Sequence, residues 1–201
     1  PSYSRVFVGK RGADSDEYFN GTIDEIAIYQ RALSSGEILA LYQQHAANTT
    51  VPGPVHNLNT NLNYTTIQAA IDDPETLDDN IIEVDPGTYN ENVEIYKSVI
   101  LRSASDNPDD TIIQAADVND HVISVTADST HVRGFTVTGT AETGGLSGGI
   151  CVDSADYCVI ENITSVNNDE GFCNLGGNHS LFFNNTAEQN YHNGIFLSDS
   201  S

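Results

Sequence analysis

Five aspartates in two short stretches could bind a calcium ion. Asp106, Asp109 and Asp110 lie within one expected turn, and Asp117 and Asp120 lie within another. Carboxylate oxygens are the ligands that calcium prefers in proteins. Neither stretch follows an established calcium-loop spacing. We therefore expect that calcium can bind, but that the fold requires no cofactor. The six histidines share no regular spacing, which argues against zinc or copper.

Three cysteines leave two kinds of thiol chemistry open. Cys151 and Cys173 occupy equivalent positions of a repeated pattern, and Cys158 lies between them. Equivalent residues of neighbouring coils come within disulfide range, although parallel strands in register aim their side chains poorly for a bridge. A disulfide between Cys151 and Cys173 and two separate thiols therefore both remain open. We expect Cys158 to be a small core residue.

Six Asn-X-Ser/Thr sequons could accept glycans, and they begin at Asn20, Asn48, Asn63, Asn162, Asn178 and Asn184. Sequons in this number are typical of an exported protein. Asn162 and Asn184 recur at one position of an expected turn, where stacked amides can form a hydrogen-bonded ladder. We expect these two side chains to point inward, which would hide them from glycosylation. The better acceptor candidates are then Asn20, Asn48 and Asn63.

A repeat of 22 to 23 residues organises the C-terminal part of the chain. The pattern that begins at Gly149-Ile150 returns at Gly171-Phe172 and again at Gly194-Ile195. This period, the abundance of Gly, Asn and β-branched residues, and the lack of a helical period indicate stacked coils of β-structure. The sequence therefore predicts a β-solenoid.

Alternation along each expected strand assigns residues to the inside or the outside of the coil. Two internal stacks are predicted, one formed by Ile150, Phe172 and Ile195, and one formed by Val132, Ile160 and Phe182. One outer column is predicted, formed by Cys151, Cys173 and Phe196. The outer column has no structural role that the sequence reveals.

Residues 1–47 have a different pattern, with expected strands at 3–9 and 22–29 and a helix that fades near Ala47. Ser34 and Glu37 have the spacing of a capping box at the start of that helix. The run from Phe19 to Ser34 resembles the closing segment of laminin-G-like, concanavalin A-like jelly-roll domains. The resemblance implies the last strands and the C-terminal helix of a truncated β-sandwich, in a family that often binds sugar.

Residues 48–63 read as a linker, and residues 64–201 as the coil domain, truncated at its C-terminal end. The domain begins with a short helix, with Thr65 as its N-cap, that covers the open end of the first coil. Thr66-Ile67-Gln68-Ala69-Ala70-Ile71, and Pro86-Gly87-Thr88-Tyr89 followed by Glu91-Asn92-Val93, resemble the opening of pectate-lyase-like β-helices. This family includes pectin methylesterases, and the resemblance implies an all-β, right-handed parallel β-helix.

Catalytic motifs of these β-helix enzymes are missing from the segment. Lyases of this fold need a basic side chain beside calcium-binding carboxylates, but residues 51–201 contain only Lys97, Arg102 and Arg133 as basic residues. The motifs of pectin methylesterases and polygalacturonases are not found either. Asp169 and Glu170 are adjacent in an expected turn, where neighbouring side chains point apart, so they make a poor acid/base pair.

The chain is acidic, with a formal net charge of −22. Such a surface repels nucleic acid and anionic membranes, and no apolar run is long enough for membrane insertion. We expect a non-catalytic structural or adhesive module of a large extracellular cell-surface protein. Its partners would be other copies, other surface proteins or glycans. Two alternatives remain: a polysaccharide-active enzyme with catalytic coils outside the segment, and a filament-forming assembly protein.

Overall fold

The computed structural model describes residues 29, 31–34, 37, 53–142 and 147–198. By its contacts the chain divides after Asn48 into two units. The predicted jelly-roll strands lie outside the described residues. One local feature of the first unit is described: the Ser34 hydroxyl accepts from the Glu37 N–H at 3.3 Å, and the Glu37 carboxylate accepts from the Ser34 N–H at 2.9 Å. This reciprocal pair is the predicted capping box.

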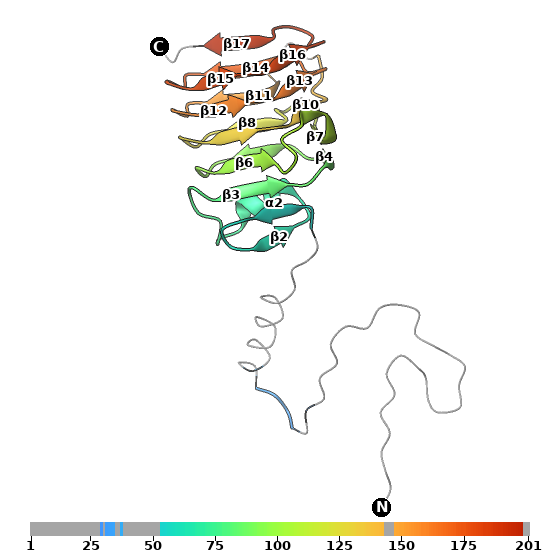
Figure 1. Ribbon diagram of the computed structural model, residues 1–201, viewed down its shortest axis with the longest axis vertical. Coiled ribbons are helices and arrows are strands. Elements are labelled where there is room, and N and C mark those ends of the chain that lie inside the picture. The colour runs from blue at the N-terminus through green and yellow to red at the C-terminus, as the bar shows by residue number, and fades with distance from the viewer. Residues whose placement is uncertain (1–28, 30, 35–36, 38–52, 143–146, 199–201) are drawn as a thin grey trace, which may run out of the picture. The chain divides into compact units, whose positions relative to one another are not determined.

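The strands of the second unit form a parallel β-helix, in which successive strands pass to three different sheets (Figure 1). The first sheet contains β15 (Leu181–Phe183), β12 (Val159–Glu161), β9 (His131–Arg133), β6 (Ile100–Ser103), β3 (Ile81–Val84), β1 (Val55–Asn57) and β2 (Leu62–Tyr64). The second contains β16 (Thr186–Glu188), β13 (Thr164–Val166), β10 (Thr136–Thr138), β7 (Thr111–Gln114) and β4 (Gly87–Asn90). The third contains β17 (Ile195–Ser198), β14 (Glu170–Leu175), β11 (Gly148–Asp153), β8 (Ile123–Val125) and β5 (Val93–Ile95).

Each coil lies in register on the one before it, and the predicted all-β, parallel β-helix fold is confirmed. Ile150 pairs with Phe172, which in turn pairs with Ile195. Ile150 and Phe172 are buried as predicted, whereas Ile195, on the last described strand, is 48% exposed. Val132, Ile160 and Phe182 form the second predicted stack, and Val132 and Ile160 are fully buried. The side chains of the stacked β-branched, leucine and phenylalanine residues fill the space between the three sheets. This apolar column is the core of the unit.

The first coil is closed by helix α2 (Ile67–Asp72), whose buried residues are Ile67, Ala70 and Ile71. The predicted capping helix is therefore present, but its N-cap is Thr66 and not Thr65. Thr66 has an extended backbone, and its side chain accepts from the Ala69 N–H at 3.2 Å. Among the described residues, no helix is long and apolar enough to cross a membrane.

Two further structural features close this end of the solenoid. Strand β1 lies within residues 48–63, which were expected to form a linker, and it pairs antiparallel with both β2 and β3. The Glu91 carboxylate accepts the backbone N–H groups of Ile67 and Gln68, both at 2.9 Å. A carboxylate at a helix N-terminus satisfies donors that have no partner within the helix. Glu91, which belongs to the motif that resembles pectate-lyase-like β-helices, therefore stabilises the N-terminus of the capping helix.

The apolar core predicts a large loss of stability when the side chain of Phe135, which is fully buried, is removed. Phe135→Ala should lower the free energy of unfolding by about 3–5 kcal/mol, because the lost contacts leave a cavity. Phe183→Ala is the matched control, since Phe183 is 45% exposed and should cost less than about 0.5 kcal/mol. Urea denaturation measures both. A cost below about 1 kcal/mol for Phe135→Ala would contradict the assigned core.

His56 predicts a specific pH dependence of stability. Its ring nitrogens lie 2.7 Å from Asn63 Oδ1 and 3.1 Å from Asp85 Oδ2. The hydrogen bond to Asn63, followed by the interactions with Asp85, raises the pKa of His56 above 6.5. A proton held more tightly by the folded state stabilises it below the unfolded-state pKa, and that stabilisation is lost as pH rises through the folded-state pKa.

The difference in melting temperature between the native chain and His56→Gln should therefore be largest near pH 5.5 and shrink towards pH 8.5. Thermal unfolding at stepped pH measures this difference. A gap that widens with rising pH would show that the sign of the shift is wrong.

Candidate functional site

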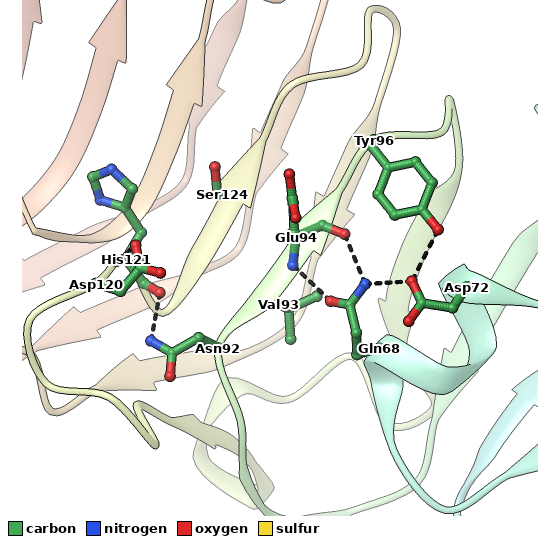
Figure 2. A pocket seen from close by; sticks show the side chains of 9 residues that line it. All are labelled: Gln68, Asp72, Asn92, Val93, Glu94, Tyr96, Asp120, His121 and Ser124. Atoms are coloured by element: carbon green, nitrogen blue, oxygen red, sulfur yellow. Dashed lines mark hydrogen bonds between the residues drawn. The ribbon is translucent and has the colours of Figure 1, made fainter.

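A polar groove of about 540 Å³ lies beside helix α2 and the outward-facing side of strands β5 and β8 (Figure 2). Eight of its nine lining residues have polar side chains, and three of these are carboxylates. The lining consists of Gln68, Asp72, Asn92, Val93, Glu94, Tyr96, Asp120, His121 and Ser124. Because it includes no lysine or arginine, the groove carries negative charge at neutral pH.

Gln68 joins the capping helix to the third sheet at one end of the groove. Its side-chain oxygen accepts from the Glu94 N–H at 2.7 Å, and its amide nitrogen donates to the Asp72 carboxylate at 2.8 Å (Figure 2). The Tyr96 hydroxyl donates to the same Asp72 oxygen at 2.9 Å. These bonds hold Asp72 and Tyr96 in fixed positions at the rim. The Glu94 carboxylate has no hydrogen-bond partner among the described residues.

Asn92 fixes the opposite end of the groove. Its side-chain oxygen accepts the N–H groups of Ala116 and Asp117, at 3.0 and 2.7 Å. Its amide nitrogen donates to the carbonyls of Asp117 and His121, at 3.0 and 2.8 Å. One side chain thus shapes the turn that carries Asp120 and His121 into the groove. The role of Asn92 depends on contacts to a later coil, which its position in the sequence does not reveal.

The calcium candidates do not come together as the sequence suggested. The Asp106 carboxylate is occupied by Arg133, whose guanidinium donates to it at 3.1 and 2.6 Å and lowers the pKa of Asp106. Within residues 53–142 and 147–198, no group of three acidic side chains converges on one point. Of the remaining candidates, Asp109, Asp110, Asp117 and Asp120, only Asp120 lines the groove.

The outer column begins at Ser124, which lines the groove, and continues through Cys151, Cys173 and Phe196 in consecutive coils. The structure joins Cys151 and Cys173 by a disulfide between neighbouring strands, with their Cα atoms 4.5 Å apart. Both cysteines are fully buried, although they face outward from the core. Cys158 is a buried thiol of the core cluster, and burial raises its pKa.

His121 approaches the two cysteines from the preceding coil. Its Nδ1 accepts the Gly148 N–H at 2.9 Å, and burial lowers the pKa of His121 below 6.5. A Cβ atom at Gly148 would lie 2.9 Å from Cys173 Sγ, so only glycine leaves room there. The potential ligand atoms of His121, Cys151 and Cys173 all lie within 4.8 Å of one another. This group could not be predicted from the repeat, because His121 precedes β8 and occupies a different repeat position from the cysteines.

The amides of Asn162 and Asn184 do contact each other, since Asn184 Nδ2 donates to Asn162 Oδ1 at 3.4 Å. The expectation that they point inward is corrected, because both residues have a left-handed backbone and lie at a partly exposed corner. Asn162 instead donates to the Asp106 carbonyl at 2.8 Å. Asn168 and Asn185 do bond the backbone of the preceding coil, since they donate to the carbonyls of Val137 on β10 and Ile160 on β12.

Of the glycosylation candidates, Asn20 and Asn48 lie outside the described residues. Asn63 is half-buried, and its side-chain oxygen lies 2.7 Å from His56 Nδ1. Asn178 is exposed in a turn, and its side chain has no hydrogen-bond partner among the described residues. Within the described sequons, Asn178 is therefore more accessible than Asn63. Glycosylation itself stays a prediction.

Asp169 and Glu170 are buried residues that join one coil to the next. Asp169 Oδ1 lies 2.6 Å from His192 Nδ1, and the Glu170 carboxylate accepts the Asn193 N–H at 2.9 Å. Asp169 is fully buried and Glu170 is 4% exposed. Both carboxylates thus serve the stacking of coils. They do not form an open pair that could exchange protons with a substrate.

Comparisons with known proteins identify related sequences and folds. Residues 77–201 match the family described as periplasmic copper-binding protein (NosD). The chain is 38% identical over 113 residues to a cell surface glycoprotein of Methanothermus fervidus, a match that covers 56% of this chain and 17% of the relative. The chain therefore spans less than a fifth of that relative's length. Both names place the proteins outside the cytoplasm, in agreement with the predicted extracellular location.

Solved structures that align with part of this chain include two structures of pectin methylesterase. The pectin methylesterase in complex with hexasaccharide VII aligns with a TM-score of 0.45 and 15% identity, over 60% of this chain and 49% of that one. PemA from Erwinia chrysanthemi aligns with a TM-score of 0.44 and 14% identity, over the same shares.

The groove predicts that Gln68 matters for stability as well as for shape. Gln68→Ala removes the bonds to Glu94 and Asp72 and should lower the free energy of unfolding by about 1–2 kcal/mol. Gln114→Ala is the matched control, because Gln114 is an exposed strand residue whose side chain has no hydrogen bond to any described residue. Chemical denaturation measures both variants. Equal, negligible costs would show that Gln68 does not join α2 to the sheet.

Proposed function

The chain belongs to the NosD family, and we propose that it is a non-catalytic module of a large cell-surface protein whose polar groove binds neutral glycans. Two observations support the surface role. The chain resembles a cell surface glycoprotein, and the match covers 17% of that relative, as expected for one module among several. The parallel β-helix also presents long, repetitive faces that suit contacts with other copies or other surface proteins.

The Glu94 carboxylate carries the proposal for the ligand. It stands in the groove without a hydrogen-bond partner among the described residues, next to the 45% exposed Tyr96. A carboxylate accepts hydrogen bonds from sugar hydroxyls, and a tyrosine ring offers an apolar face with a polar edge. Sugars present the complementary combination of hydroxyls and C–H faces.

Charge favours neutral over acidic glycans. The groove is lined by Asp72, Glu94 and Asp120 and by no basic residue, in a chain with a formal net charge of −22. An anionic uronate would meet like charges at close range, which is unfavourable even in a solvated site. A neutral oligosaccharide avoids this repulsion and keeps the hydrogen bonds.

Calorimetric titration of the chain with neutral and uronate-containing oligosaccharides tests the proposal. Neutral sugars should bind more tightly, and Tyr96→Ala or Glu94→Gln should each weaken binding about 10-fold, the equivalent of one hydrogen bond to a charged group. Tyr191→Ala is the control, because Tyr191 is 53% exposed but lies outside the groove.

Three results would contradict the glycan proposal: tighter binding of uronates, no binding of any sugar, or an equal loss in Tyr191→Ala. A polysaccharide-active enzyme stays the alternative, and the same titration would reveal it as cleavage of the bound sugar. Product analysis of the titrated sample separates binding from turnover.

The copper in the family's description needs free donor atoms. The group of His121, Cys151 and Cys173 contains the nitrogen and sulfur types that copper accepts, but His121 Nδ1 already accepts the Gly148 N–H at 2.9 Å. While the cysteines form a disulfide, neither sulfur is a thiolate, and thiolates are the sulfur ligands that bind metals strongly. The proposed glycan-binding function therefore involves no copper.

A further inference from the structure

We propose that the groove selects sugars that carry an N-acetyl group, because His121 presents a hydrogen-bond donor and Glu94 an acceptor of fixed polarity. An acetamido group has one C=O acceptor and one N–H donor, and it carries no charge. His121 donates to its carbonyl oxygen, and Glu94 accepts from its N–H. The assignment rests on the glycan-binding function proposed above and names the class of sugar that the groove takes.

The tautomer of His121 makes this side chain a donor. Its Nδ1 accepts the Gly148 N–H at 2.9 Å. A neutral imidazole that accepts at one ring nitrogen carries its proton on the other. Burial lowers the pKa of His121 below 6.5, so the ring is neutral at pH 7. Nε2 therefore bears the proton, and His121 brings an N–H donor to the lining of the groove.

The other side-chain nitrogens of the groove are committed to the protein. The Gln68 amide donates to the Asp72 carboxylate and to the Glu94 carbonyl, at 2.8 and 3.3 Å. The Asn92 amide donates to two backbone carbonyls of a later turn, at 3.0 and 2.8 Å. Neither amide can turn to a ligand without losing these bonds. Among the nine lining residues, the nitrogen donor left for a ligand is therefore the ring N–H of His121.

Glu94 is the matching acceptor. Asp72 already accepts from the Tyr96 hydroxyl at 2.9 Å, and Asp120 accepts the backbone N–H of His121 at 2.8 Å. The Glu94 carboxylate has no hydrogen-bond partner among the described residues. An ionised carboxylate accepts hydrogen bonds and donates none. The ligand must therefore bring an N–H or an O–H group to Glu94.

The positions of the two groups suit an amide. Glu94 on β5 pairs directly with Ser124 on β8, and in the view of Figure 2 Ser124 lies between His121 and Glu94. The C=O and N–H bonds of a trans amide point in opposite directions. One acetamido group can therefore accept from His121 on one side while it donates to Glu94 on the other.

Other groups on a sugar use this pair of residues less well. A hydroxyl has its donor and its acceptor lone pairs on a single oxygen, whereas an amide separates them across the O=C–N unit. An amino sugar without the acetyl group has N–H donors for Glu94, but it lacks the carbonyl that accepts from His121. The bond to Glu94 is charge-assisted, which makes it about twice as strong as a bond between neutral groups.

Calorimetric titration of the full chain with three matched trisaccharides tests the assignment. The linear β-linked trimers of N-acetylglucosamine, glucose and glucosamine differ only in the group at one carbon of each ring. We expect the acetylated trimer to bind about 10-fold more tightly than either of the others, the equivalent of one further hydrogen bond to a charged group.

Variants identify the donor. His121→Phe should reduce the preference for the acetylated over the glucose trimer to less than about 2-fold, because the ring N–H is lost. His121→Gln should keep most of the preference, since its amide can accept from Gly148 and still donate. His179→Phe is the matched control, because His179 is exposed and stacks on Tyr157 outside the groove. It should keep the full preference, and an equal loss in this control would contradict the role of His121.

Nitrogen NMR of the isotope-labelled chain at neutral pH reads the tautomer without any variant. His121 should carry its proton on Nε2. At equal saturation, the acetylated trimer should shift this N–H signal more than the glucose trimer does. A proton on Nδ1 of the free chain, or equal shifts with both trimers, would overturn the assignment.

The titration separates this assignment from the glycan-binding function on which it rests. Equal affinity for the acetylated and the glucose trimers would overturn the choice of sugar and leave glycan binding intact. Absence of binding by all three trimers would overturn both. Tighter binding of the glucosamine trimer would show selection for positive charge, and tighter binding of an acetylated, amidated triglycine would show selection for a peptide. Either result would overturn the N-acetyl sugar as the ligand.

Discussion

Parallel pairing in register between successive coils is the constraint on which the rest of the molecule depends. Each strand of the third sheet bonds to the equivalent strand of the next coil, so β5, β8, β11, β14 and β17 form one continuous sheet. A residue therefore points to the same side of its sheet as its equivalents one coil away. The inner stack of Ile150, Phe172 and Ile195 and the outer pair of cysteines follow from this single rule.

The same constraint decides where polar groups can be buried. A coil must turn between strands, and each turn leaves backbone groups without a partner in a sheet. Asn168 and Asn185 supply donors to inner carbonyls, while Asp169 and Glu170 bind residues of the following coil. Buried amides and carboxylates are thus used for stacking. The side chains available to a ligand are those on the outer face, where the groove and the cysteines lie.

Much of the fold could be predicted from the sequence, because the repeat reports the register directly. The internal stacks, the outer cysteine column and the presence of a capping helix all follow from period and alternation. The position of the N-cap could not be predicted in this way, because Thr65 and Thr66 are both able to cap the helix. The backbone of Thr66, which is extended, decides between them. The direction of Asn162 and Asn184 was also mistaken, since a left-handed corner reverses the usual alternation.

The candidate site was far less predictable than the fold. Gln68 reaches Glu94, 26 residues later, and Asn92 reaches a turn about as far ahead. Such contacts depend on the conformations of turns that differ in length from coil to coil. The sequence period does not encode these conformations. His121 was missed for the same reason, because it joins the cysteines from a turn and from another repeat position. Repetition identifies the scaffold, whereas Asn92, Asp120 and His121 enter the groove from the connections between strands.

The arrangement of the outer face depends on the register that sets Cys151 directly beside Cys173. Mass-spectrometric peptide mapping of the unreduced, air-exposed chain checks this register, because a disulfide requires Cα atoms within about 7 Å. We expect a single bridge between Cys151 and Cys173, with Cys158 recovered as a free thiol. A bridge that includes Cys158 would contradict the register and, with it, the arrangement of the outer face.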